Sequence, residues 1–71
     1  MSELRNGLYR HYKGYDYQVI GVASHSETRE SLVVYKALYG EMGLWVRPLS
    51  MFIEQVEVDG VSQPRFEFIH Q

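Results

Sequence analysis

The stretch that decides the fold reads LWVRPLSMFI and covers residues 44–53. Its first four residues alternate as a strand does, with aliphatic side chains on one face and Trp45 and Arg47 together on the other. Pro48 ends this pattern, because proline cannot donate a hydrogen bond to a sheet and suits the first position of a turn or short 3₁₀ helix. The stretch therefore predicts a strand, a 3₁₀ turn and a further strand that begins near residue 53.

The rest of the chain predicts more strands of the same kind. Short runs rich in β-branched and aromatic residues predominate, and none is long enough for an amphipathic helix. The predicted strands cover residues 8–12, 17–24, 32–38, 44–47, 53–58 and 65–69. The turns between them are predicted at Lys13-Gly14, residues 25–30, residues 39–43 and Asp59-Gly60. Five to six antiparallel strands with a short 3₁₀ turn before a late strand indicate a mainly β fold, a small SH3-like barrel or roll.

The second predicted strand has apolar side chains on both faces. Ile20 and Val22 share one face, whereas Tyr17, Val19 and Ala23 share the other. A strand with one face in water would alternate between apolar and polar residues. We therefore expect this strand at the centre of the sheet, covered on both sides.

Length and composition limit the organisation of the chain. Its 71 residues are 45% hydrophobic and 14% aromatic, which predicts a single domain over residues 1–71 with a core at about residues 7–69 and frayed termini. A chain of this size buries only ~60% of its unfolded surface, so a large enzyme core with a deep cleft is not expected. The absence of cysteine excludes disulfides, thiolate nucleophiles and cysteine-ligated metal sites.

The charge argues against a protein held to nucleic acid by bulk electrostatics. Seven Lys and Arg stand against nine Asp and Glu, for a net charge of −2 and a pI of 5.8. A local basic patch is compatible with this balance. Residues 1–13 hold three cations and one acid, a sum of +2, and residues 54–71 hold one cation and four acids, a sum of −3.

The N-terminus and the hydropathy pattern indicate where the protein resides. Residues 1–7 read MSELRNG, with charges where a signal peptide needs an apolar segment. No apolar run approaches the ~20 residues of a membrane helix. We expect no membrane association and a location in a reducing, bacterial-type cytoplasm.

The densest polar segment, residues 25–30, allows two interpretations. It contains His25, Glu27 and hydroxyl residues, which are candidates for general base catalysis. Sequence neighbours in a loop do not point at one another, and no glycine-rich element offers an oxyanion site, so we favour a solvated hairpin loop. Motifs of the types GxxxxGK[ST], GxGxxG, GxSxG and HExxH do not occur.

Metal ligation by histidine is the next candidate chemistry. His11, His25 and His70 could gather with Glu27 around a divalent cation. No HxH or HxxxH pair places two such ligands on one element. We therefore expect no metal site and no cofactor.

Aromatic residues beside cations are the strongest functional feature, as in residues 9–13 and 45–47. Exposed rings stack on bases, peptides or cationic groups, and Arg47 would hold a phosphate or carboxylate beside them. The alternatives are that the rings fill the core and that Arg47 pairs with Glu27 or Glu54 across the sheet. The predicted ligand site is a shallow depression formed by His11, His25, Glu27, Tyr39, Trp45 and Arg47.

Several motifs in fixed order resemble a known family. They are YRHYKG at residues 9–14, HSET at 25–28, VVY at 33–35, LYG at 38–40, WVRP at 45–48 and MF at 51–52. Together they make the chain similar to the bacterial domain of unknown function 1653 over about residues 7–68. The resemblance implies a small SH3-like β-barrel or roll with no assigned activity.

The resemblance also implies a nucleotide or nucleic-acid setting, because some relatives join this domain to a nucleotide hydrolase of the Nudix kind. The present sequence has no motif of that hydrolase. The family has no established catalytic residues to carry over. The residues that enter as positions of its motifs are Tyr9, His11, His25, Glu27, Tyr35, Tyr39, Trp45 and Arg47.

Three classes of function stay open. We favour a small binding module with a shallow aromatic and basic surface for a peptide, a nucleotide or a nucleic acid. The first alternative is a small enzyme that uses His25 with Glu27, or His11, as a general base on a nucleotide-like substrate. The second is a structural interaction subunit. We expect binding rather than catalysis, and we allow for weak self-association.

Overall fold

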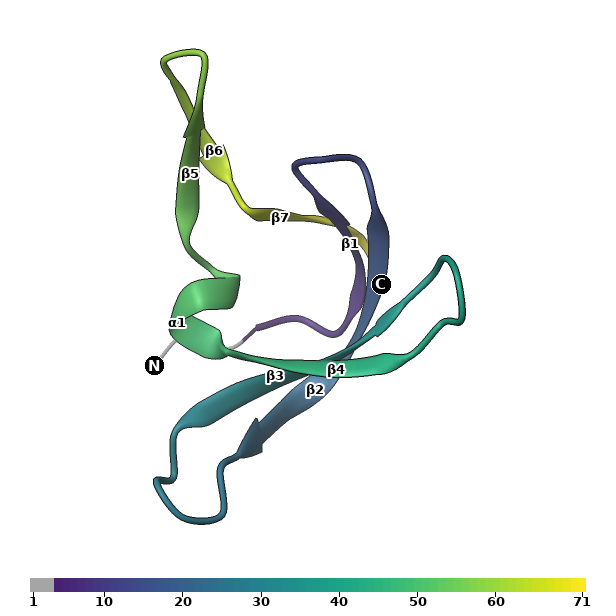
Figure 1. Cartoon of the computed structure of the whole chain (residues 1–71), viewed down its shortest axis with the longest axis vertical. Coiled ribbons are helices and arrows are strands. Elements are labelled where there is room, and N and C mark those ends of the chain that lie inside the picture. The colour runs from purple at the N-terminus through teal and green to yellow at the C-terminus, as the bar shows by residue number, and fades with distance from the viewer. Residues whose placement is uncertain (1–3) are drawn as a thin grey trace.

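The structure, a computed structural model, describes residues 4–71 and is mainly β (Figure 1). Its strands confirm the mainly β class that the runs of β-branched and aromatic residues predict. Within the described residues, seven strands and one short helix follow in the order β1 (Gly7–His11), β2 (Asp16–Ser24), β3 (Ser31–Ala37), β4 (Leu44–Pro48), α1 (Leu49–Phe52), β5 (Gln55–Val58), β6 (Val61–Pro64) and β7 (Phe66–His70).

Five strands form one antiparallel sheet in the order β4-β3-β2-β1-β7, and β5 pairs only with β6. The sheet curls around α1, and the hairpin β5–β6 extends away from it (Figure 1). Strands β4 and β7 are the two edges, and no pairing joins them within residues 4–71. A closed SH3-like barrel is therefore not found. The chain leaves the sheet at Pro48, which lacks an N–H, and turns into α1 instead of continuing the sheet.

In the hairpin β5–β6, strand β5 lies within the predicted strand at residues 53–58, and β6 is the strand that the sequence pattern missed. Asp59 and Gly60 form the predicted turn, and their positive φ values of 53° and 79° are those of a tight hairpin turn. The strand after this turn reads VSQP and is mostly exposed, so it has no hydrophobic alternation to reveal it. The predicted strand start at residue 53 is wrong as well, because Ile53 caps α1.

The turn after Pro48 is an α-helical turn and not the predicted 3₁₀ turn. The Ile53 N–H donates to the carbonyl oxygen of Leu49, four residues earlier, at 3.1 Å. This geometry turns Phe52 toward the sheet, where its side chain is only 1% exposed.

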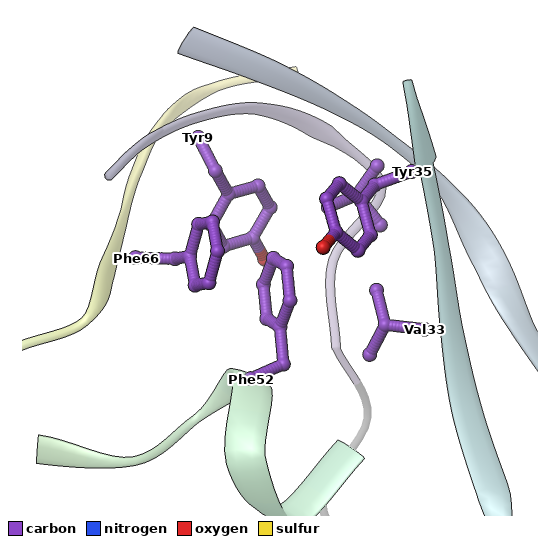
Figure 2. Close-up of a cluster of buried hydrophobic side chains, with 6 residues drawn as sticks. Tyr9, Val33, Tyr35, Phe52 and Phe66 are labelled. Carbon is purple, nitrogen blue, oxygen red and sulfur yellow. The ribbon is translucent and has the colours of Figure 1, made fainter. Parts of the chain in front are cut away.

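The core lies inside the curl of the sheet (Figure 2). Phe52 from α1 stacks on Phe66 of β7 with 4.1 Å between ring centroids and 4° between ring planes. Tyr9 meets Phe52 edge to face at 5.5 Å, and its hydroxyl donates to the carbonyl of Arg5 at 2.8 Å. The buried cluster consists of Tyr9, Val19, Val33, Tyr35, Phe52 and Phe66.

Strand β2 is central, as predicted, but it is not covered on both sides. It lies between β3 and β1, and its register shifts at Ile20, where a bulge interrupts the pairing with β3. Ile20 is 50% exposed and Val22 is 45% exposed. The expectation of two buried faces was wrong because the pattern of alternating faces assumes a regular strand, and a bulge breaks it.

The last strand of the sheet extends almost to the C-terminus. His70 ends β7 and pairs with Leu8 of β1. The N-terminal part of the predicted fraying concerns residues 1–3, which lie outside the described residues. Among residues 4–71, no helix has the length and apolar character needed to cross a membrane.

Candidate functional site

An aromatic and cationic surface lies where the two sheet edges approach each other without pairing. We call it the seam and define it by His11, Tyr17, Tyr35, Arg47 and Phe66. Arg47 on edge strand β4 reaches the other edge strand, since its guanidinium carbon lies 5.8 Å from the centroid of the Phe66 ring on β7. Its Nε donates a hydrogen bond to the hydroxyl of Tyr35 at 3.3 Å. The side chain of Arg47 thus connects the two edge strands β4 and β7, which no backbone pairing joins within residues 4–71.

Register explains why these side chains meet. Directly opposed residues of an antiparallel pair share a face of the sheet. Arg47 is opposite the buried Val33, and Trp45 is opposite the buried Tyr35, so both face the interior of the curl. On the other edge, His11 is opposite Phe66.

Three tyrosines extend the seam toward the turn between β3 and β4. The hydroxyls of Tyr17 and Tyr39 are 2.7 Å apart, and the rings of Tyr15 and Tyr39 are 4.9 Å apart. Burial, followed by the hydrogen bond to Tyr39, raises the pKa of Tyr17. The Tyr17 phenol is therefore neutral at physiological pH and serves as a hydrogen-bonding group, not as a base.

His11 lies on the side of the seam opposite Arg47, on strand β1 next to Phe66 of β7. Its ring lies 4.9 Å from that of Phe66 and 4.6 Å from that of Tyr12. Its Nδ1 accepts the backbone N–H of Lys13 at 3.2 Å, so in the neutral ring the proton is on Nε2. Burial, followed by the charges of Arg65, Arg47 and Lys13, lowers the pKa of His11. His11 is thus a neutral donor in a cationic setting.

Trp45 offers an open aromatic surface beside the seam. It shares its face of β4 with Arg47, as predicted, and it is 58% exposed. It is also the single tryptophan of the chain. A planar group can therefore reach its ring from solvent, and its fluorescence will report such contact.

The predicted ion pair of Arg47 with Glu27 or Glu54 is absent from the described residues. Glu54 instead binds Arg65, with 2.8 Å between its Oε1 and Nη2 of the arginine. The other ion pair within residues 4–71 joins Arg10 to Asp16 at 2.8 Å. Arg47 has no carboxylate partner in this part of the chain, although it is partly buried.

His25 and Glu27 do not join the seam. They follow β2, whereas His11 and Tyr12 precede it, so about 30 Å of extended strand separates the two ends. The Nδ1 of His25 accepts the backbone N–H groups of Glu27 and Thr28 at 3.1 and 3.3 Å. The Thr28 hydroxyl accepts the N–H of Glu30 at 3.2 Å. These bonds stabilise the conformation of the hairpin loop, and no ion pair joins His25 to Glu27 within residues 4–71.

Of the predicted site residues, the structure therefore brings together His11, Tyr39 and Arg47, with Trp45 on the same face, and separates His25 and Glu27. His11, Trp45 and Arg47 do not line one common cavity. A depression of about 140 Å³ opens beside His11, but neither Trp45 nor Arg47 lines it. Within residues 4–71, no three His, Asp or Glu side chains gather closely enough to hold a metal ion.

Sequence reasoning missed Tyr17, Tyr35, Phe66, Lys13 and Arg65 as members of the site. Tyr17 and Tyr35 stand in apolar strand patterns, which are typical of core residues. Lys13 and Arg65 are 52 positions apart in the sequence, and only the pairing of β1 with β7 brings their segments together. Lys13 belongs to the predicted aromatic and cationic run at residues 9–13, whereas no sequence motif indicates Arg65.

Fold and seam together define a small all-β protein with a partly buried aromatic and cationic seam and an exposed tryptophan beside it. The family model described as "Protein of unknown function (DUF1653)" matches residues 7–68, and the chain belongs to this family. A crystal structure of a DUF1653 protein from Bordetella bronchiseptica is similar, with 41% sequence identity and a TM-score of 0.86 over 93% of this chain and 87% of that one. A search of the curated proteins gave no match. The family resemblance of the sequence motifs is confirmed.

Proposed function

We propose that this protein is a binding module that recognises a ligand carrying both a planar ring and a phosphate, as a nucleotide or a short single-stranded nucleic acid does. The ring stacks on Trp45, and the phosphate binds Arg47. The observation that carries this proposal is the guanidinium of Arg47. It is partly buried and lacks a carboxylate partner within residues 4–71.

A partly buried cation without a counter-ion is costly, because its desolvation is not offset. The hydrogen bond from Nε to Tyr35 positions the guanidinium and leaves its two Nη groups for an anion. Arginine presents these groups as a planar fork that matches phosphate and carboxylate oxygens. An anionic ligand would supply the negative charge that the described residues do not place beside Arg47.

The neighbouring aromatic residues favour a ligand with a flat ring. Trp45 is 58% exposed and lies two residues from Arg47 on the same face of β4, so a base and its phosphate can contact both. Of the ligand classes predicted from the sequence, the nucleotide and the nucleic acid carry phosphate, whereas a peptide does so only when modified. The enzyme alternative has less support, since His25 is engaged by backbone groups of its own loop.

Fluorescence of Trp45 tests the proposal directly. We expect mononucleotides and short single-stranded oligonucleotides to quench it, because a stacked base contacts the only indole of the chain. Trp45→Ala should weaken binding by about 5- to 150-fold, the effect of losing ~1–3 kcal/mol of stacking, as followed by calorimetry. Arg47→Gln should weaken it by about tenfold or more, since a charge-assisted hydrogen bond contributes ~1.5–3 kcal/mol.

Two matched controls lie on the opposite face of the same sheet. Leu44 is 65% exposed on β4, and Lys36 on β3 pairs opposite it. Leu44→Ala and Lys36→Gln change exposed area and charge as the test variants do, and both should leave the affinity unchanged. The proposal is wrong if these controls weaken binding as much as Trp45→Ala and Arg47→Gln, or if no nucleotide or oligonucleotide quenches Trp45.

Salt dependence should be shallow if a nucleic acid binds. Each phosphate neutralised on a single strand contributes about 0.7 to the slope of log affinity against log salt. Three cations lower the pKa of His11, those of Arg65, Arg47 and Lys13, whereas Arg10 beside His11 is paired with Asp16. We expect a slope no steeper than about −2 in titrations at several salt concentrations. A slope near −5 would mean that other cations hold the strand and that the seam is not the site.

We further propose that the open sheet is an SH3-like roll. The support is its strand order, β4-β3-β2-β1-β7, together with a helical turn between β4 and the last strands. The single-domain organisation, the cytoplasmic location and the weak self-association stay predictions.

A further inference from the structure

We propose that the phosphate group of the ligand binds beside His11, among three cationic side chains, and that its binding is coupled to uptake of a proton by His11. The three cations are Lys13, Arg47 and Arg65. This inference rests on the proposed function and adds to it the position of the phosphate and the dependence of binding on pH.

The geometry places these groups around one aromatic ring. Phe52 covers one face of Phe66, and His11 and Arg47 approach the rest of that ring, at 4.9 Å and 5.8 Å from its centroid. Arg65 directly precedes Phe66, and its carbonyl accepts the N–H of Tyr12 at 2.9 Å. Strands β4 and β1 thus each bring a nitrogen-bearing side chain to this ring, and the backbone of Arg65 lies beside the turn that follows β1.

Lys13 belongs to the same site through the turn after β1. Its backbone N–H donates to Nδ1 of His11 at 3.2 Å, and its ammonium lies 6.0 Å from the centre of the Tyr12 ring. Because Nδ1 is an acceptor, the proton of the neutral ring is on Nε2. His11 can therefore donate Nε2–H to an anion before it takes up any proton.

Arg65 has donors in excess of the acceptors around it. Glu54 accepts one hydrogen bond, from Nη2 at 2.8 Å. The Nε of Arg65 is buried and has no hydrogen-bond partner within residues 4–71. A buried donor without an acceptor costs about 1–3 kcal/mol. Glu54 thus balances the charge of Arg65 but does not satisfy all its donors, and the two remaining cations have no carboxylate partner in the described residues.

The groups that face His11 explain the coupling to protons. The turn contributes Lys13 and the phenol of Tyr12, and β2 contributes the phenol of Tyr17. Strand β4 contributes the cation of Arg47, and the residue before β7 contributes the cation of Arg65. On the outer side, Glu67 and Arg10 line the depression beside His11, and Arg10 is paired with Asp16. Cations prevail around the ring, which is one reason why its pKa is lowered below the usual value.

An anion bound among these cations reverses their effect. It stabilises the protonated ring and so raises the pKa of His11. By reciprocal linkage, the protonated protein binds the anion more tightly than the neutral one. The affinity is therefore greatest below the pKa of free His11 and falls as the pH rises through the pKa of the bound state.

NMR titration of the histidine rings in the full chain tests this inference with sulfate, an oxyanion that does not change its own charge over the pH range used. The ionic strength is matched with chloride. We expect sulfate to raise the pKa of His11 by about half a unit or more, which corresponds to about threefold tighter binding to the protonated form. His25 lies at the other end of β2 from His11 and is the internal control, so sulfate should leave the chemical shifts of its ring unchanged.

Variants separate a local site from general screening. Arg47→Gln should reduce the sulfate-induced shift in the pKa of His11 by half or more, whereas Lys36→Gln, on the outer face of β3, should leave it intact. AMP should raise the pKa of His11, and adenosine, which lacks the phosphate, should not. The inference is overturned if sulfate and AMP leave His11 unaffected, or if they shift His25 equally.

The outcomes also separate this inference from the proposed function. Quenching of Trp45 by nucleotides without any change at His11 would retain the proposed function and overturn the position of the phosphate. A sulfate-induced shift at His11 without quenching of Trp45 by any nucleotide or oligonucleotide would retain the anion site and overturn the proposed function.

Discussion

Replacement of Phe52 by alanine is expected to remove a large part of the free energy of unfolding. The Phe52 side chain is 1% exposed and stacks on Phe66 with 4.1 Å between the ring centroids. Removal of a buried phenylalanine side chain lowers the free energy of unfolding by about 3–5 kcal/mol. A chain of 71 residues has a total of only about 4–10 kcal/mol. Urea denaturation followed by circular dichroism measures the loss.

Met51 is the matched control for this substitution. It neighbours Phe52 in α1 but is 44% exposed, so Met51→Ala should change the free energy of unfolding by less than about 1 kcal/mol. Equal effects of the two substitutions would mean that helix α1 does not dock as the structure places it. A Phe52→Leu variant should recover part of the loss, because it refills most of the volume.

Alanine at Gly7 is expected to detach the C-terminal end of β7. Gly7 has a φ of +140°, which L side chains rarely adopt, and a Cβ there would lie 2.6 Å from the carbonyl oxygen of His70. Backbone on the neighbouring strand must then move. We expect the free energy of unfolding to fall by about 2–4 kcal/mol, from backbone strain and from lost pairing between β1 and β7. Hydrogen exchange of residues 66–70 should accelerate most.

Substitution of Gly14 separates the effect of backbone strain from the effect of the steric clash with His70. It also has a positive φ, +99°, but a Cβ there would meet no atom within 4 Å. Gly14→Ala therefore adds strain without a clash and should lower the free energy of unfolding by about 1–2 kcal/mol. Similar losses at Gly7 and Gly14 would show that the close approach to His70 is not a constraint.

Both substitutions act on contacts that hold the seam. Phe66 is the surface against which Arg47 and His11 lie, and Phe52 supports it from the opposite side. Gly7 permits the pairing of β1 with β7 that carries Phe66. Loss of either contact should therefore also weaken ligand binding, although neither residue would touch the ligand.

Much of the secondary structure could be predicted from local pattern. The strands near residues 8–12, 17–24, 32–38, 44–47 and 65–69 are confirmed to within one or two residues. Alternation, β-branched residues and turn residues act within a few positions, so sequence alone reveals them. Two elements failed this test: β6, which is too polar and exposed to alternate, and the bulge at Ile20, which local pattern does not encode.

The site was predictable in part for the same reason. Trp45 and Arg47 share a face because they are two residues apart in a strand, and this much follows from the sequence. The grouping of His25 and Glu27 with them was not supported, since the printed polar contacts of His25 are with backbone groups of its own hairpin loop. Sequence reasoning had no measure of distance along the sheet, so it joined His25 and Glu27 to His11, from which the nine-residue strand β2 keeps them apart.

The sequence by itself determined that the chain is mainly β, that β4 ends at a proline and that one face of β4 carries an indole and a guanidinium. Each of these depends on residues close together in the chain. Only the tertiary structure decided that Arg47 meets Phe66 and that Arg65 lies near His11. The first meeting depends on the curl of the five-stranded sheet, which brings its edge strands β4 and β7 close together without pairing them, and the second depends on the pairing of β1 with β7. No local pattern encodes that curvature or that pairing.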